Sequence, residues 1–114
     1  MSDPSLKNES LLHKLREVSQ QYAEAEAERQ YLMEFRKAKK AILMGEAERT
    51  NPSMPIGKQE RYAYAHPEYI ELLKGLKVAI ERAILLKHRI QVITMRFEQW
   101  RSIKATERAE WNAR

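Results

Sequence analysis

The feature that most constrains the fold is an apolar repeat in the C-terminal half of the chain. From Tyr69 to Trp100 an apolar or aromatic residue recurs at alternating spacings of three and four, and no polar residue interrupts the series. A seam of this kind is typical of a long helix that packs along another helix. Its ten positions are Tyr69, Leu72, Leu76, Ala79, Ala83, Leu86, Ile90, Ile93, Phe97 and Trp100.

A first long helix is predicted over residues 9–48. Asp3 and Pro4 offer an earlier start, a side-chain cap followed by a proline at the first helical position, while a polar residue at 8–10 would begin the helix later. The apolar stripe shifts in phase after Ala25, which indicates a stutter within one continuous helix. The stripe consists of Leu11, Leu15, Val18, Tyr22 and Ala25, followed by Leu32, Phe35, Ala38 and Ile42.

One clear connection separates the two long helices. Two prolines and a glycine lie within residues 50–57, and together they cannot continue a helix. Residues 58–65 have the pattern of a short helix that ends at His66, and the following proline suits the first turn of a long helix over 67–111. The sequence therefore predicts a single all-α domain, a long helical hairpin with a short connecting helix.

The last helix carries a second apolar stripe with a seven-residue repeat, made of Val78, Leu85 and Val92. A helix that is apolar on two sides needs two partners. The first helix supplies one, and we expect another copy of the chain to supply the other, giving a homo-oligomer assembled through the last helix. A monomeric three-element bundle that covers both stripes is the alternative. The residues expected at the oligomer interface are Leu72, Leu76, Leu86, Ile90, Ile93, Phe97 and Trp100.

A ridge of arginines, also seven residues apart, separates the two stripes: Arg82, Arg89 and Arg96. Charges that flank a helical seam commonly select the partner helix. We expect ion pairs, within the chain or between copies, to glutamates of the first helix; a groove for a polyanion is the alternative. The glutamates that follow one face of the first helix are Glu17, Glu24, Glu28 and Glu34.

Composition places the chain among soluble, helix-rich proteins. It has no cysteine, which fits the reducing cytoplasm, and no apolar run that approaches the length of a membrane span. The net charge of +5 is unevenly distributed, because residues 1–35 are acidic whereas 36–61 and 62–114 are basic. This pattern favours a polyanion partner or a charge-complementary neighbouring subunit; a solvated basic face is the alternative.

No pattern of catalytic or metal-binding residues is present. The three histidines do not stand three or four residues apart, and neither a phosphate-binding glycine loop nor a zinc or di-iron motif occurs. A helical hairpin also offers few concave places where polar groups converge. We expect a protein that is not an enzyme and that has no cofactor.

The densest functional signal is a basic cluster near the end of the first helix, with four cationic side chains within residues 36–40. Basic and aromatic residues also lie in the short helix. Cations for phosphates and flat rings for unpaired bases are typical of proteins that bind single-stranded nucleic acid. The alternative is that the tyrosines cover the end of the hairpin and the lysines confer solubility. The candidate contacts are Arg36, Lys37, Lys39, Lys40, Lys58, Arg61, Tyr62 and Tyr64.

This layout resembles the small phage recombination mediators of the UvsY type, and the local likeness is strongest over residues 89–98, RIQVITMRFE. The central segment is shorter than in those mediators. The resemblance implies a ring-like homo-oligomer, binding of single-stranded DNA by the basic segment, and help in loading a RecA-like recombinase onto DNA coated by single-strand-binding protein.

The sequence thus favours a non-enzymatic, cytoplasmic accessory factor for phage-type recombination or replication that binds single-stranded DNA as a homo-oligomer. The alternative is a helical scaffold or modulator of a host complex that binds protein only.

Overall fold

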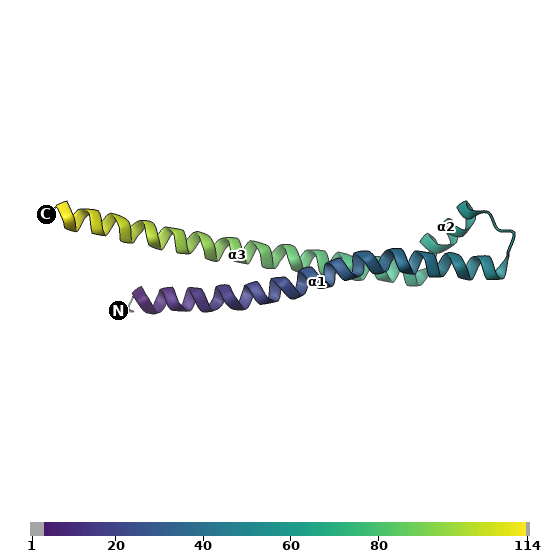
Figure 1. Cartoon of the computed structure of the whole chain (residues 1–114), viewed down its shortest axis with the longest axis horizontal. Helices are drawn as coiled ribbons and strands as arrows, with labels where there is room; N and C mark the ends of the chain where they lie inside the picture. The colour runs from purple at the N-terminus through teal and green to yellow at the C-terminus, as the bar shows by residue number, and fades with distance from the viewer. Residues whose placement is uncertain (1–3, 114) are drawn as a thin grey trace. The chain divides into compact units, whose positions relative to one another are not determined.

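A computed structural model describes the backbone of residues 4–113 and the side chains of residues 8–113. This part of the chain contains three helices and no strand: α1 (Pro4–Thr50), α2 (Ile56–Ala65) and α3 (Pro67–Ala113) (Figure 1). The prediction of an all-α chain, with two long helices joined through a short one, is confirmed. The first helix begins at Pro4, earlier than residue 9, whereas the cap expected from Asp3 lies outside the described residues.

The chain divides into two compact units. Unit 1 joins α1 up to Ala23 with α3 from Ile84 onward, and unit 2 comprises residues 24–83, including all of α2. Over the described residues, no helix contains a segment that is both long enough and apolar enough to cross a membrane.

The predicted seam of α3 is confirmed, because all ten of its side chains are buried or half-buried. In unit 2 the buried members are Tyr69, Leu76, Ala79 and Ala83, and in unit 1 they are Leu86 and Ile93. Regular spacing keeps these side chains on one side of α3, where they pack within each unit against the segment of α1 that belongs to it.

The seven residues expected at an oligomer interface belong to this seam. Leu76, Leu86 and Ile93 are 6–8% exposed, and the other four are half-buried. Packing within a single chain thus buries three of them and partly covers the other four, and their contact with another copy stays a prediction. The second stripe is what remains open: the exposed fractions of Val78, Leu85 and Val92 are 63%, 65% and 49%.

The helix α1 is continuous, as predicted, but the expected phase shift in its buried side does not occur. In unit 2 the buried positions include Ala25, Leu43 and Ala47, whereas Phe35 is 37% and Ile42 50% exposed. The other inward positions of this segment are half-buried and include Arg29, Leu32, Arg36 and Lys39. The seam of α3 has no phase shift, so α1 keeps the same side toward it. The long side chains of Arg29, Arg36 and Lys39 lie on that side, where their aliphatic stems can pack while their charged ends reach solvent.

The connection after α1 is held by local hydrogen bonds. The Ser53 hydroxyl donates to Asn51 Oδ1 at 2.8 Å, and the backbone N–H of Met54 donates to the Asn51 carbonyl at 3.0 Å. The amide of Gln59, which is only 9% exposed, donates to the Met54 carbonyl at 3.0 Å. A buried glutamine thus ties the first turn of α2 to the loop before it.

A small core fixes α2 within unit 2. Leu43 of α1 and Ala63 of α2 are fully buried, Tyr69 of α3 is 6% exposed, and Met44 packs against this cluster. All three helices contribute to the core, so α2 is held beside the last turns of α1 and the first turns of α3.

Candidate nucleic-acid interface

All eight candidate contacts lie in unit 2, four on α1 and four on α2. Two contacts of Lys40 connect the helices. Its ammonium lies 4.8 Å from the centre of the Tyr64 ring and 3.7 Å from Glu60 Oε1. The Tyr64 side chain and then Glu60 raise the pKa of Lys40, and partial desolvation opposes them. The structure therefore brings a lysine, a tyrosine and a carboxylate together at the contact between α1 and α2.

Lys39 is held by the first turn of α3. Its ammonium donates to Glu68 Oε2 at 2.6 Å, although the two residues are 29 positions apart in the sequence. The hydrogen bond and the charge of Lys39 lower the pKa of Glu68, and His66 adds a smaller effect in the same direction. The backbone N–H of Glu68 also donates to His66 Nδ1 at 3.1 Å, which fixes the start of α3.

Lys37 forms an ion pair with Glu34 at 3.2 Å on the surface of α1. Both side chains are about 70% exposed, and exposed pairs of this kind contribute little free energy. Arg36 is half-buried and makes no ion pair within the described residues. Three of the four cations in the α1 cluster are thus already matched with carboxylates of the chain, which the sequence analysis did not anticipate.

The outer side of α2 has a different character. Lys58, Arg61 and Tyr62 stand at spacings of three and four and share one exposed face, opposite the buried Gln59 and Ala63. Neither cation makes an ion pair within the described part of the chain, and the tyrosine is 41% exposed. We call Lys58, Arg61 and Tyr62 the α2 face. It presents two free cations beside an accessible ring.

The aromatic rings of this region are partly fixed by edge contacts. The Tyr62 ring meets the His66 ring edge-on with centroids 5.7 Å apart, and Tyr64 meets Tyr69 in the same way at 5.5 Å. Tyr64 remains 47% exposed, so neither tyrosine is a buried plug of the kind considered as an alternative. These contacts restrict the orientation of both tyrosine rings, and the Lys40 ammonium lies over the Tyr64 ring.

Tyr31 is a surface aromatic residue that was not predicted from the sequence. Its side chain is 61% exposed, and its ring stacks on Phe35 with centroids 5.9 Å apart and an interplanar angle of 9°. The spacing of four within α1 is the signal that would have found the pair. Phe35 also lines, with Lys39 and Leu72, an open hollow of about 490 Å³ in unit 2.

The arginine ridge lies on the exposed side of α3. Arg82, Arg89 and Arg96 are exposed and unpaired among the described residues. Of the four glutamates expected to match them, only Glu34 forms an ion pair, and its partner is Lys37. Over the part of the chain that the structure describes, the intrachain pairing considered for the ridge is therefore not formed, and its cations remain available to other molecules.

The chain matches no protein-family model, and no curated protein or solved structure gives a significant match. The likeness to recombination mediators therefore remains an expectation from the sequence.

Proposed function

We propose that the protein is a non-enzymatic accessory factor that binds single-stranded DNA through the α2 face. The observation that carries the proposal is the exposure of Lys58, Arg61 and Tyr62 on one side of a short helix, with both cations free of ion pairs within the described residues. Cations attract the phosphates, and an accessible ring stacks on an unpaired base whatever its identity. Binding of this kind depends little on the base sequence of the DNA and is weakened by salt.

The cluster on α1 extends the face. Lys40 lies over the Tyr64 ring, so a cation and a half-exposed aromatic side chain stand together at the contact between the two helices. Lys39 and Lys40 form ion pairs with Glu68 and Glu60. In this proposal the DNA strand contacts the α2 face first. The two lysines then release their carboxylate partners and bind phosphates of the strand.

The wider role follows from the likeness to the UvsY-type mediators. In the proposal the protein acts in the cytoplasm, assembles as a homo-oligomer, and assists a RecA-like recombinase on DNA covered by single-strand-binding protein. The exposed stripe of Val78, Leu85 and Val92 supports assembly, because a row of large apolar side chains is unfavourable in water. Several copies would multiply weak contacts to one strand.

The direct test is the fluorescence anisotropy of a labelled oligo-dT, measured at several salt concentrations. We expect saturable binding whose affinity falls steeply with salt. The variant Lys58→Gln/Arg61→Gln should reduce the slope of log K against log salt by about 1.4, because each lost contact to single-stranded DNA removes about 0.7. Tyr62→Ala should weaken binding by about 1–3 kcal/mol, the usual contribution of one base stacked on an aromatic ring.

Matched controls are available in the same unit. Lys77→Gln/Arg82→Gln removes two exposed cations that make no ion pair among the described residues, and Tyr31→Ala removes an exposed ring from α1. The controls should bind as the unaltered protein does. Absence of binding by the unaltered protein at low salt would overturn the proposal, and an equal loss in both double variants would show a general effect of charge.

A second candidate function is a scaffold that binds protein only. The ion pairs of Lys37, Lys39 and Lys40 favour it, because they already occupy most of the α1 cluster. The stacked pair of Tyr31 and Phe35 also suits a protein partner. The anisotropy titration separates the two functions, since a scaffold of this kind gives no salt-dependent binding to oligo-dT.

A further inference from the structure

The C-terminal part of α3 contains a second basic site, separate from the α2 face and wholly within unit 1. A hollow of about 430 Å³ is lined there by Trp100, Ser102 and Ala105 together with four charged residues. Its volume falls in the range of about 300–1,000 Å³ typical of small-molecule sites. The charged members of the lining are Glu98, Arg101, Lys104 and Arg108.

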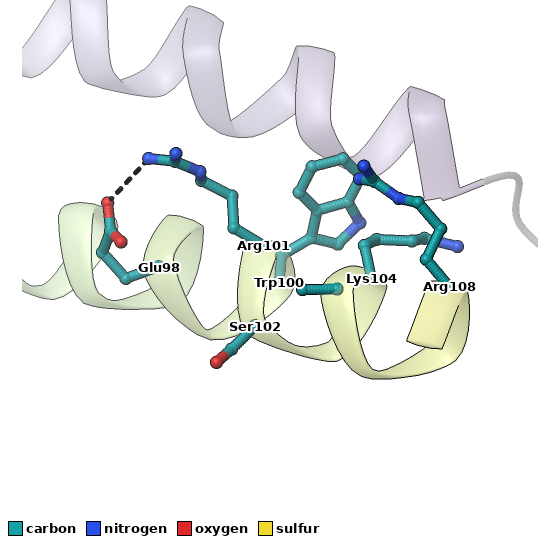
Figure 2. Close-up of a pocket in the computed structure, with 7 residues that line it drawn as sticks. Glu98, Trp100, Arg101, Ser102, Lys104 and Arg108 are labelled. Atoms are coloured by element: carbon teal, nitrogen blue, oxygen red, sulfur yellow. Dashed lines mark hydrogen bonds and ion pairs between the residues drawn. The ribbon is translucent and has the colours of Figure 1, made fainter. Parts of the chain in front are cut away.

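Helical spacing explains why the cations converge. Arg101, Lys104 and Arg108 stand at spacings of three and four along α3, so they follow one side of the helix. Figure 2 shows their side chains extending on the same side of the ribbon as the Trp100 indole. The lining carries three positive charges and one negative charge, so its net charge is +2.

The cations of this site are only loosely matched. Arg101 lies 3.4 Å from Glu98 in a pair whose side chains are more than 60% exposed, and Lys104 lies 3.2 Å from Glu107. Arg108 makes no ion pair within the described residues. Exposed pairs within one helix are weak, so a ligand with a higher charge density than a carboxylate can displace them.

An indole donor at the site lacks a partner. Trp100 Nε1 is inaccessible to solvent and makes no hydrogen bond in the structure. Figure 2 shows the Arg108 side chain extending toward this indole, whereas the Lys104 ammonium points away from it, and both residues line the hollow. Long flexible side chains such as these reorient readily to bind an anion. A buried N–H without an acceptor is unfavourable, and an anion oxygen would relieve it.

We infer that this site binds a phosphate group, with Arg108 and Lys104 pairing with its oxygens and the Trp100 indole donating to one of them. A phosphate carries up to two negative charges and several acceptor oxygens, which match the net charge of the lining and its unsatisfied donors. Free phosphate compounds and the phosphodiesters of nucleic acid share this chemistry. The inference does not depend on the α2 face, because no residue is common to the two.

The alternative explanation is that these cations serve the helix itself. Positive side chains near a helix C-terminus interact favourably with the backbone carbonyls, and α3 ends at Ala113. No basic residue lies in the last turn of α3, so this interaction is weak at Arg108, and it gives no role to the unpartnered indole N–H. It also predicts no saturable response to phosphate, so the two explanations are separable by titration.

The fluorescence of Trp100 provides the test. The chain has two tryptophans, and Trp111 is 75% exposed, so Trp111→Phe leaves a folded protein with Trp100 as its single probe. Titration of this variant with sodium pyrophosphate, at constant ionic strength set with sodium chloride, should change the emission saturably, with half-saturation below about 1 mM. The absence of a saturable change would overturn the inference.

Two further variants identify the residues. Arg108→Gln in the Trp111→Phe background should weaken pyrophosphate binding by about tenfold or more, because it removes a charge-assisted contact. Arg96→Gln is the matched control, since Arg96 is also exposed and unpaired within the described residues but lies outside the hollow. Equal weakening in both variants would indicate general charge attraction and would overturn a defined site.

The role of the indole donor is measured by calorimetry. Trp100→Phe keeps an aromatic ring but removes the N–H, so pyrophosphate should bind several-fold more weakly while the helical circular dichroism is unchanged. Unchanged affinity would overturn the assignment of the donor. A parallel titration with a dT dinucleotide distinguishes the sources of phosphate: a saturable response to it indicates nucleic acid, and a response to pyrophosphate alone indicates a free phosphate compound.

Discussion

Neutralising Glu60 and Glu68 together should strengthen the binding of single-stranded DNA. These carboxylates hold Lys40 and Lys39 at 3.7 Å and 2.6 Å, so under the proposed function they compete with phosphates for the two lysines. A strand that uses the two lysines must first break both ion pairs. Replacing the carboxylates by glutamine removes this competition and leaves side chains of nearly the same size.

The structure sets the size of the effect. The side chains of Glu60 and Glu68 are 44% and 60% exposed, so each pair is screened by solvent and contributes little free energy. Releasing one lysine should then lower the Kd for oligo-dT about 1.4- to 5-fold. The double variant Glu60→Gln/Glu68→Gln should lower it about 2- to 30-fold if the two effects add.

Fluorescence anisotropy with labelled oligo-dT measures this change, and urea unfolding of the same samples provides an independent check. Glu68 lies in the first turn of α3, where a carboxylate stabilises a helix through its interaction with the backbone N–H groups. The variant should therefore bind more tightly and unfold more easily. A variant that folds poorly would instead lose both affinity for oligo-dT and stability to urea.

The matched control is Glu71→Gln/Glu81→Gln, which also removes two carboxylates from unit 2. Glu71 pairs with Lys74 at 3.3 Å, and Glu81 makes no ion pair within the described residues, so neither holds a candidate contact. If the control gains as much affinity as Glu60→Gln/Glu68→Gln, the gain comes from net charge and the competition argument is refuted. An unchanged Kd in the test variant, with clear binding by the unaltered protein, would refute it as well.

Other predictions concern stability. Gly45→Ala and Gly75→Ala should each raise the free energy of unfolding in urea by about 0.5–1 kcal/mol, because both glycines lie within helices and an added Cβ meets no other atom within 4 Å. A loss of stability would show that the added Cβ does contact neighbouring atoms. Gln59→Ala should lower the same quantity by about 1–3 kcal/mol, since a loop carbonyl loses its donor. Leu43→Ala should cost about 2–5 kcal/mol, and an unchanged midpoint would contradict its place in the core. Glu68 has a lowered pKa, so the stability that it adds is complete above the ordinary value of 4.5 and is lost as the pH falls below it. Thermal melting between pH 3 and pH 6 should show this acid loss in the unaltered protein and a smaller one in Glu68→Gln.

The helices themselves follow from local information. The unbroken apolar series from Tyr69 to Trp100 indicates both the length of α3 and the side that it buries. The prolines and glycine of residues 50–57 similarly locate the interruption after α1. Spacing and backbone restriction act within a few residues, so a single sequence is sufficient to read them.

The sequence by itself determined an all-α chain, the seam of α3 and the position of its basic segments. Only the tertiary structure decided which side of α1 is buried and which cations are free. The side chains of Phe35 and Ile42 are exposed because the seam of α3, rather than the hydrophobicity of α1, selects the face that packs. Lys39 is paired because Glu68 approaches from 29 positions away, whereas Lys58 makes no ion pair among the described residues. Contacts at such separation have no periodic signal in a sequence, and here they decide which charges remain available to a ligand.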